Sequence, residues 1–255
     1  MKRIQALDGP TPGLVDYRKG GSDQANWDGF CSHQSGAAKR ELTEALCSIQ
    51  HGLCRYCEID IIECDRQIEH VIPQSDPEQG KARALDPTNM MICCKGGTRQ
   101  TNDDARWLQP PRRRINRNWN ISCGEAKGDF RDPQFIDPRD LPALPSLVRV
   151  DYEGEISADE DACIDTEIDV SRVEQTIQIL GLNVPRLQIA RKRHWDALND
   201  NWKEYLDNPQ VMQQVARMEL LPKADGHLPR FFSTSRSYFG SVAEEILAEA
   251  PQAWI

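Results

Sequence analysis

The cysteines are the first side chains of this sequence whose type and spacing could do chemistry. Nine are present, and Cys54 and Cys57 form a Cys-x-x-Cys pair. Zinc takes four thiolates at the corners of a tetrahedron, and such a pair supplies two of them from one short turn. One of Cys93 and Cys94, together with Cys123, would complete the set. The sequence therefore predicts a structural zinc site, the alternative being ordinary buried thiols.

A second group of chemically useful residues lies between the two halves of that predicted zinc site. Glu69 and His70 are adjacent in a short apolar run, and Asn89 follows further along. At the end of a strand, the carboxylate can bind a divalent cation while the imidazole takes a proton from water. An asparagine can hydrogen-bond the nearby backbone and fix the ring. We predict a hydrolytic site, the alternative being that His70 is a core histidine without a chemical role.

The charge of the chain limits the partners it can bind. The formal net charge is −9, from 31 basic and 40 acidic residues, so the molecule as a whole is not a basic nucleic-acid binder. Residues 95–117 nevertheless carry seven basic side chains, whereas residues 151–169 carry nine acidic and no basic ones. We expect a local phosphate-binding face, the alternative being a solvated charge run. Its candidate residues are Arg112, Arg113, Arg114 and Arg117, with Lys127 further on, which could instead cap a helix.

The elements that must position these residues follow from composition and hydrophobic periodicity. The first 35 residues are rich in Gly, Ser, Asp and Asn, which predicts an extended or irregular arm, anchored by Trp27 and Phe30. Apolar residues at three- and four-residue spacing predict a helix over 37–51. Short β-branched runs predict strands over 59–62, 68–72 and 90–92, with a polar loop over 75–87.

The second half of the sequence has the pattern of a helical region. A proline-rich strap over 131–150 ends in a strand-like run at 147–150. Ser171 and Glu174 have the spacing of a capping box at the start of a helix. Further helices are predicted over 185–205, 210–221 and 242–250.

Together these patterns predict an α+β fold with a zinc-stapled N-terminal module and a mainly α-helical C-terminal region. The predicted divisions are an arm over 1–36, a module over 37–150 that includes a basic insertion at 95–120, and a helical region over 151–255. No apolar run is long enough for a transmembrane helix, and the first residues lack a secretion signal, so we expect a cytoplasmic protein.

The order of these motifs resembles the HNH nucleases of the zinc-bound ββα-metal type. The segments that carry the resemblance are Gln50–Glu58, Ile68–Ser75 and Ser122–Asp129. More closely, they are similar to the HNH subunit of bacterial anti-phage systems of the Septu type and of certain retrons. The resemblance spans most of the chain.

The resemblance implies a role for each motif residue. His70 would be the general base that activates water against a phosphodiester, and Glu69 would be a ligand of a catalytic Mg²⁺ or Mn²⁺ ion. Asn89 would orient the loop that carries the histidine. The family places its third zinc ligand five residues after this asparagine, which selects Cys94 over Cys93.

One position departs from the family pattern. Many HNH modules carry His or Asn directly after the fourth cysteine as the last metal-contacting residue, and here that position is Gly124. Either Glu125 or Asp129 substitutes, or the cation is held by fewer protein ligands and more waters, which Mg²⁺ tolerates.

The resemblance also implies partners. The nuclease would work beside an ABC-type or SMC-like ATPase, with the helical region 151–255 as the docking part, on a nucleic-acid substrate that we expect to be DNA. A retron reverse transcriptase and its RNA–DNA hybrid would be further partners. Two alternatives remain: a non-catalytic zinc-ribbon module that binds nucleic acid, and a structural subunit of the ATPase complex.

Overall fold

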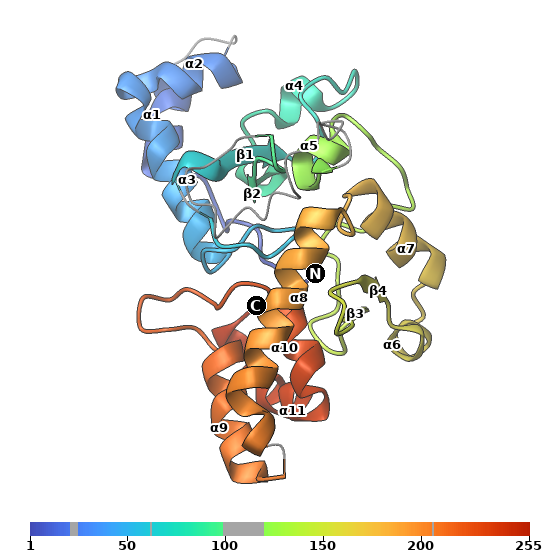
Figure 1. The fold of residues 1–255 in the computed structure, drawn as a ribbon. Helices are drawn as coiled ribbons and strands as arrows, with labels where there is room; N and C mark the ends of the chain where they lie inside the picture. Colours follow the sequence, from blue (N-terminus) through green and yellow to red (C-terminus); the bar gives the residue numbers. More distant parts are fainter. Residues whose placement is uncertain (21–24, 62, 99–119, 206) are drawn as a thin grey trace.

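The computed structural model describes residues 1–20, 25–61, 63–98, 120–205 and 207–255. Its N-terminal half holds α1 to α5 with the β1–β2 hairpin, and its C-terminal half holds the remaining helices (Figure 1). The predicted phosphate-contacting residues Arg112, Arg113, Arg114 and Arg117 lie outside the described residues.

Much of the N-terminal arm is helical, so the prediction of irregular structure over the first 35 residues is wrong for residues 12–20 and 27–35, whereas residues 1–11 do lack regular structure. The arm contains α1 (Pro12–Gly20), α2 (Trp27–Ser32) and the 3-10 turn η1 (His33–Gly36). The Asn26 side chain caps α2 by accepting the Gly29 N–H at 2.9 Å, and Leu14 and Phe30 are fully buried against α3 (Ala37–Ile49). A cap and tertiary burial outweigh the loop-like composition. The anchoring role predicted for Phe30 is confirmed.

A two-stranded antiparallel hairpin carries the predicted catalytic residues. β1 (Arg66–His70) pairs with β2 (Met90–Cys94), so that His70 lies opposite Met90 and Arg66 opposite Cys94. The connection holds α4 (Gly80–Arg83) and η3 (Pro87–Asn89), and η2 (Glu63–Asp65) precedes β1. The short helix α5 (Cys123–Lys127) packs against β2.

The strand predicted over 59–62 is wrong for the part of it that the structure describes. That part forms the isolated bridge between Leu53 and Asp60. Its backbone instead closes the turn around the Cys-x-x-Cys pair, because Cys54 N–H donates to Ile59 O at 2.8 Å.

The C-terminal half contains a second hairpin and five longer helices. β3 (Val148–Val150) pairs with β4 (Ile156–Ala158), and α6 (Glu160–Asp165) follows within the acidic stretch. The helices after it are α7 (Val170–Ile179), α8 (Pro185–Trp202), α9 (Pro209–Leu220), α10 (Phe232–Phe239) and α11 (Ser241–Glu249), with turns η5 (Lys203–Tyr205) and η6 (Pro251–Ala253).

Two details of this half differ from the sequence prediction. The cap of α7 is Asp169, whose side chain accepts the Ser171 N–H at 2.8 Å, so Ser171 is not the cap. Helix α10 was not predicted, because its Ser- and Thr-rich sequence has weak helix propensity. Six of its eight side chains are buried, and this packing stabilises the helix.

Three buried clusters form the core, and their members cross the predicted divisions at 36/37 and 150/151. One cluster joins α1 and α2 to α3 and β2, a second joins the cysteines to residues 136–187, and a third joins α8 to α11 with Leu53. The division into arm, module and helical region stays a prediction. Within the described ranges, none of the helices has the length and apolar character needed to cross a bilayer.

Candidate metal and catalytic centre

Four cysteines from three separate segments meet in one buried cluster. The Sγ atoms lie 3.9 Å apart for Cys54 and Cys123, 3.7 Å for Cys57 and Cys94, and 3.6 Å for Cys94 and Cys123. Thiolates bound to zinc at about 2.3 Å in a tetrahedron are separated by about 3.8 Å. All four are buried, and their ligand atoms lie within 4.8 Å of one another. The cluster can therefore bind a metal ion and is consistent with structural zinc.

The fold fixes this cluster from several directions. Gln50, at the end of α3, is fully buried and exchanges two hydrogen bonds with the Ile92 backbone of β2, at 2.8 and 2.9 Å. Cys94 lies at the end of β2 and Cys123 begins α5. The Cys123 N–H donates to Leu180 O at 2.8 Å, which ties α5 to the end of α7. The C-terminal half thus helps to hold the fourth thiol.

The imidazole of His70 is held in one tautomer beside a cleft. Its Nε2 lies 2.9 Å from Ala84 O, and since a carbonyl can only accept, Nε2 carries the proton. Nδ1 is left as the acceptor and receives the Gln74 amide at 3.3 Å. Burial lowers the pKa of His70 below its ordinary value, which favours the neutral ring. A neutral imidazole with Nδ1 as its acceptor can take a proton.

Aromatic packing fixes the plane of the same ring. The Trp27 indole of α2 meets His70 edge to face, with ring centroids 4.6 Å apart and an interplanar angle of 87°. The N-terminal arm therefore covers one side of the predicted base. The sequence identified Trp27 as an anchor of the arm but did not predict its contact with His70. The two residues are 43 positions apart, and nothing in the sequence indicates that they meet.

The carboxylate of Glu69 is surrounded by donors. Tyr56 OH donates to Oε1 at 2.6 Å, and Lys127 Nζ lies 3.5 Å from the same oxygen. Cys93 Sγ donates to Oε2 at 3.2 Å. Burial raises the pKa of Tyr56 well above its usual value, so the hydroxyl keeps its proton. Oε1 is thus engaged by a hydroxyl donor and an ion-paired ammonium, and Oε2 is engaged by a weak thiol donor.

Asn89 holds the backbone of the loop that follows His70. It is fully buried, and its Oδ1 accepts the Ile72 N–H at 2.8 Å. Its Nδ2 donates to Ile72 O and Arg83 O, each at 3.1 Å. Arg83 precedes Ala84, whose carbonyl fixes the His70 ring. Asn89 therefore braces both segments that determine the orientation of the imidazole.

Glu69 and His70 line one cleft of about 550 Å³ together with residues of α5 and the segment after it. Its lining residues are Gln67, Ile68, Glu69, His70, Pro73, Gln74, Ser75, Gly124, Glu125, Gly128 and Asp129. The predicted ligand Asp129 and the base are thus brought to one cavity. In the described ranges, the cysteine cluster is the one group of His, Cys, Asp or Glu residues with close-set ligand atoms, so the carboxylates of the cleft do not form a preformed cage.

The chain is similar in sequence to two known proteins. No protein-family model matches it. It is 28% identical over 245 residues to "Retron Ec83 putative HNH endonuclease" of Escherichia coli, which covers 88% of each chain. It is 25% identical over 185 residues to "Retron Vc95 putative HNH endonuclease" of Vibrio cholerae serotype O1 biovar El Tor, which covers 72% of this chain and 78% of the relative. These two relatives support an HNH endonuclease family assignment for the chain.

Lys127 is the predicted site residue that is more deeply buried than the sequence suggested. It was predicted to contact nucleic acid or to cap a helix, and its Nζ donates to Gly128 O at the C-terminus of α5 at 3.4 Å, as a cap does. Its side chain is 3% exposed, and the same ammonium lies 3.5 Å from Glu69. Its contact with nucleic acid stays a prediction. The structure adds Tyr56, Cys93 and Gln74 to the neighbourhood of the HNH residues. None of these was selected from sequence, although Tyr56 lies inside the Cys-x-x-Cys motif.

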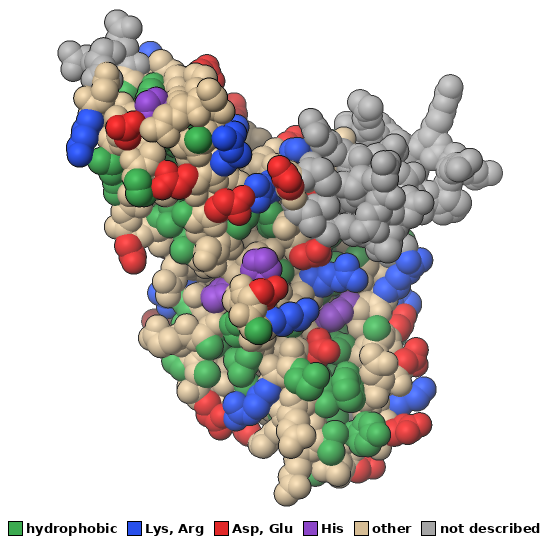
Figure 2. Space-filling model, turned by 90° about the vertical axis from the view of Figure 1, so that its left-hand side faces the viewer, with side chains coloured by type: hydrophobic (Ala, Val, Ile, Leu, Met, Phe, Trp, Pro, Cys, Tyr) green, Lys and Arg blue, Asp and Glu red, His purple; other side chains and the backbone are tan. Residues whose placement is uncertain are grey.

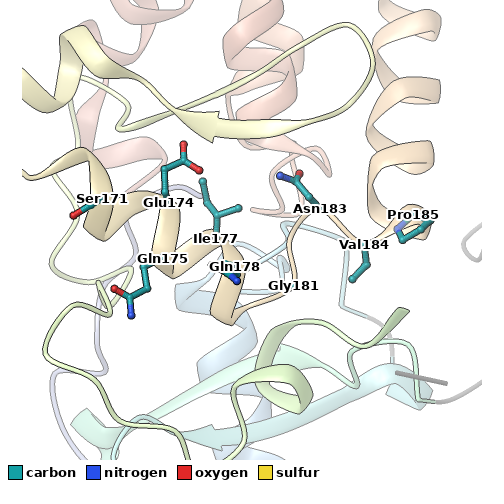
Figure 3. A pocket seen from close by; sticks show the side chains of 9 residues that line it. All are labelled: Ser171, Glu174, Gln175, Ile177, Gln178, Gly181, Asn183, Val184 and Pro185. Carbon is teal, nitrogen blue, oxygen red and sulfur yellow. The ribbon is translucent and has the colours of Figure 1, made fainter. Parts of the chain in front are cut away.

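A larger pocket, of about 960 Å³, lies at the junction of α7 and α8 and shares no lining residue with the cleft of Glu69 and His70 (Figure 3). Its lining includes one carboxylate and neither histidine nor cysteine. Glu174 Oε1 accepts the Ala158 N–H at 2.7 Å, and Asn183 exchanges two hydrogen bonds with the Ile156 backbone. These polar groups serve to hold β4, so the pocket offers no chemistry comparable to that of the cleft.

Proposed function

We propose that this chain is a metal-dependent HNH endonuclease that hydrolyses phosphodiesters with His70 as the general base. The observation that carries the proposal is the tautomer of His70. Its Nε2–H is bound to Ala84 O at 2.9 Å, and its Nδ1 is an acceptor beside the cleft that Glu69 also lines. In this arrangement Nδ1 takes the proton of an attacking water, while Asn89 keeps the loop in register.

The scaffold of the proposed nuclease is a zinc-bound ββα module. β1, β2 and α5 supply the ββα elements, and Cys54, Cys57, Cys94 and Cys123 hold structural Zn²⁺. The support is the Sγ–Sγ separations of 3.6–3.9 Å together with complete burial, which are the geometry and environment of a closed zinc site.

Glu69 and Asp129 are the residues that would hold a catalytic Mg²⁺ or Mn²⁺ ion. The bound cation would neutralise charge on the phosphate and on the leaving oxygen. Mg²⁺ commonly binds through one or two carboxylates, with waters and substrate phosphates completing its shell, so the open arrangement of the cleft fits it. Glu69 contributes Oε2, because Oε1 is engaged by Tyr56 and Lys127.

The proposed biological setting is supported by the names of the two relatives. Both carry the word retron in their names, which supports an effector role in anti-phage defence for this chain. We place it in the cytoplasm with a DNA substrate, an ABC-type or SMC-like ATPase partner docked on residues 151–255, and a retron reverse transcriptase with its RNA–DNA hybrid. On the face shown in Figure 2, acidic and basic side chains are interspersed. The proposed phosphate contacts are Arg112, Arg113, Arg114 and Arg117, which rest on the basic run in the sequence alone.

Plasmid cleavage with Mg²⁺ or Mn²⁺ tests this function. His70→Ala should abolish cutting and keep the zinc content, whereas His227→Ala, which alters a histidine whose side chain is 57% exposed, should cut like the wild type. Each protein is assayed with and without the proposed ATPase partner, on DNA and then on RNA. Equal cutting by His70→Ala and wild type would show that the base is misassigned. Absence of cutting by the wild type on every substrate would favour the non-catalytic zinc-ribbon function.

A further inference from the structure

Gly124 occupies a helical position at which glycine is not required by the backbone. It is the second residue of α5, directly after Cys123. It is absent from the glycines with positive φ, so an L-residue can adopt its conformation. Alanine is the better helix former at such a position. A backbone explanation for Gly124 is therefore excluded, and the explanation must lie in what surrounds its Cα.

The space next to Gly124 is filled by the Glu69 carboxylate. A Cβ at residue 124 would lie 2.0 Å from Glu69 Oε2, 3.0 Å from Glu69 Cδ and 3.1 Å from Cys93 Sγ. Contacts under 3.0 Å are not tolerated, so one of these groups would have to move. The Glu69 side chain has little freedom to do so, because Tyr56 and Lys127 hold Oε1 and Cys93 contacts Oε2.

We propose that Gly124 is a positioning residue for Glu69. Because glycine has no side chain, the volume next to its Cα is free, and Oε2 of Glu69 occupies it. Both residues line the cleft. Residue 124 therefore contributes room in place of a ligand atom, and the reach of the Glu69 side chain supplies the carboxylate oxygen at this point. The catalytic consequence rests on the proposed nuclease function, whereas the steric coupling between Gly124 and Glu69 does not.

The coupling is tested by unfolding the zinc-loaded protein without Mg²⁺ or Mn²⁺. Gly124→Ala should lower Tm by about 3–8 °C, as expected for an overpacked buried site. In the Glu69→Asp and Glu69→Ala backgrounds, whose side chains are too short to fill the space, Gly124→Ala should leave Tm unchanged or raise it. The matched control is Gly20→Ala, because a Cβ at the C-terminal residue of α1 would have no neighbour within 4 Å.

Direct titration with Mn²⁺ provides the second readout. Gly124→Ala should weaken Mn²⁺ binding at least about tenfold while the protein keeps one zinc, since displacement of Oε2 removes a ligand without disturbing the thiolates. A general structural defect would lower the zinc content as well. Gly20→Ala should bind Mn²⁺ like the wild type.

The outcomes separate this proposal from the proposed function. A Tm loss for Gly124→Ala that is the same with and without the Glu69 side chain, or no loss in any background, overturns the positioning role. A background-dependent Tm loss combined with unchanged Mn²⁺ affinity also overturns it, because Gly124 would then pack against Glu69 without serving the cation. If the wild type cleaves no nucleic acid, the nuclease function fails, and the Tm and Mn²⁺ comparisons still decide the role of Gly124.

Discussion

The cysteine cluster and the neighbouring cleft share β1, β2 and α5, but their geometry arises in different ways. In the cluster, four identical ligands converge to within 4.8 Å, and their backbones are held by Gln50 and by the hydrogen bond from Cys123 to Leu180. In the cleft, Glu69 and His70 depend on a tyrosine hydroxyl, a lysine ammonium, a backbone carbonyl and the absence of a side chain at residue 124. Residue type is therefore enough to recognise the ligands of the cysteine cluster. The orientation of Glu69 and His70 depends instead on the residues packed around them.

The largest effect is expected where the cluster itself is broken. Cys94→Ala should lose zinc and most of the folding free energy, because structural zinc contributes of the order of 10 kcal/mol. Cys93→Ala, one residue earlier, should keep about one zinc per chain, since its Sγ faces Glu69. Metal analysis of the two purified variants distinguishes them, and zinc retained by Cys94→Ala would remove that residue from the ligand set.

The next effect concerns the buried ion pair in the cleft. Lys127→Met should lower the free energy of unfolding by about 3–5 kcal/mol, because it leaves Glu69 charged and buried without its cation. Lys192→Met breaks a surface pair with Glu153 that solvent screens, so its loss should be far smaller. Urea denaturation measures both. Equal losses would mean that the Lys127 contact contributes no more than a surface pair.

Loss of the Asn89 side chain should lower the cleavage rate through the orientation of His70, in addition to any loss of stability. Asn89→Ala should reduce cleavage about 10–100-fold with zinc retained, because the loops around His70 lose their brace. Asn183→Ala removes an equivalent amide clamp from β4, away from the cleft, and should reduce stability while sparing cleavage. If both variants cleave at the same rate, Asn89 has no specific role in orienting the base.

The smallest effect lies in the helical half and depends on pH. Burial, with the nearby charge of Arg230, lowers the pKa of His194 to about 4. The unfolded chain binds this proton near pH 6.5 and the folded chain near 4, so stability is lost as the pH falls through this interval. The loss is about 1–2 kcal/mol, because the ring is partly exposed. Urea midpoints of wild type and His194→Gln between pH 7 and 4 check it; parallel curves would contradict it.

The sequence predicted correctly those features that depend mainly on residue type and spacing. It identified the four cysteines now found clustered, the strands that carry His70 and Cys94, and the principal C-terminal helices. It could not identify the helices of the arm or α10, because these form through tertiary burial that local composition does not encode.

The supports of the cleft were hidden for a related reason. The Ala84 carbonyl acts through the backbone, so no side chain marks it in the sequence. Gly124 acts through an empty volume, and the sequence presented it as a missing ligand. Lys127 was recognised as a charge, but its burial and its contact with Glu69 depend on the packing of α5. Sequence therefore located the cleft without revealing how its carboxylate is held.

Chemical rescue of the base tests the central claim most directly. His70→Gly should lose cleavage about 10²–10⁴-fold, the usual contribution of a general base. The cleft of about 550 Å³ that His70 lines can admit free imidazole. The account predicts that added imidazole restores measurable cleavage to His70→Gly and none to Glu69→Ala. Wild-type cleavage by His70→Gly, or equal rescue of both variants, would contradict it.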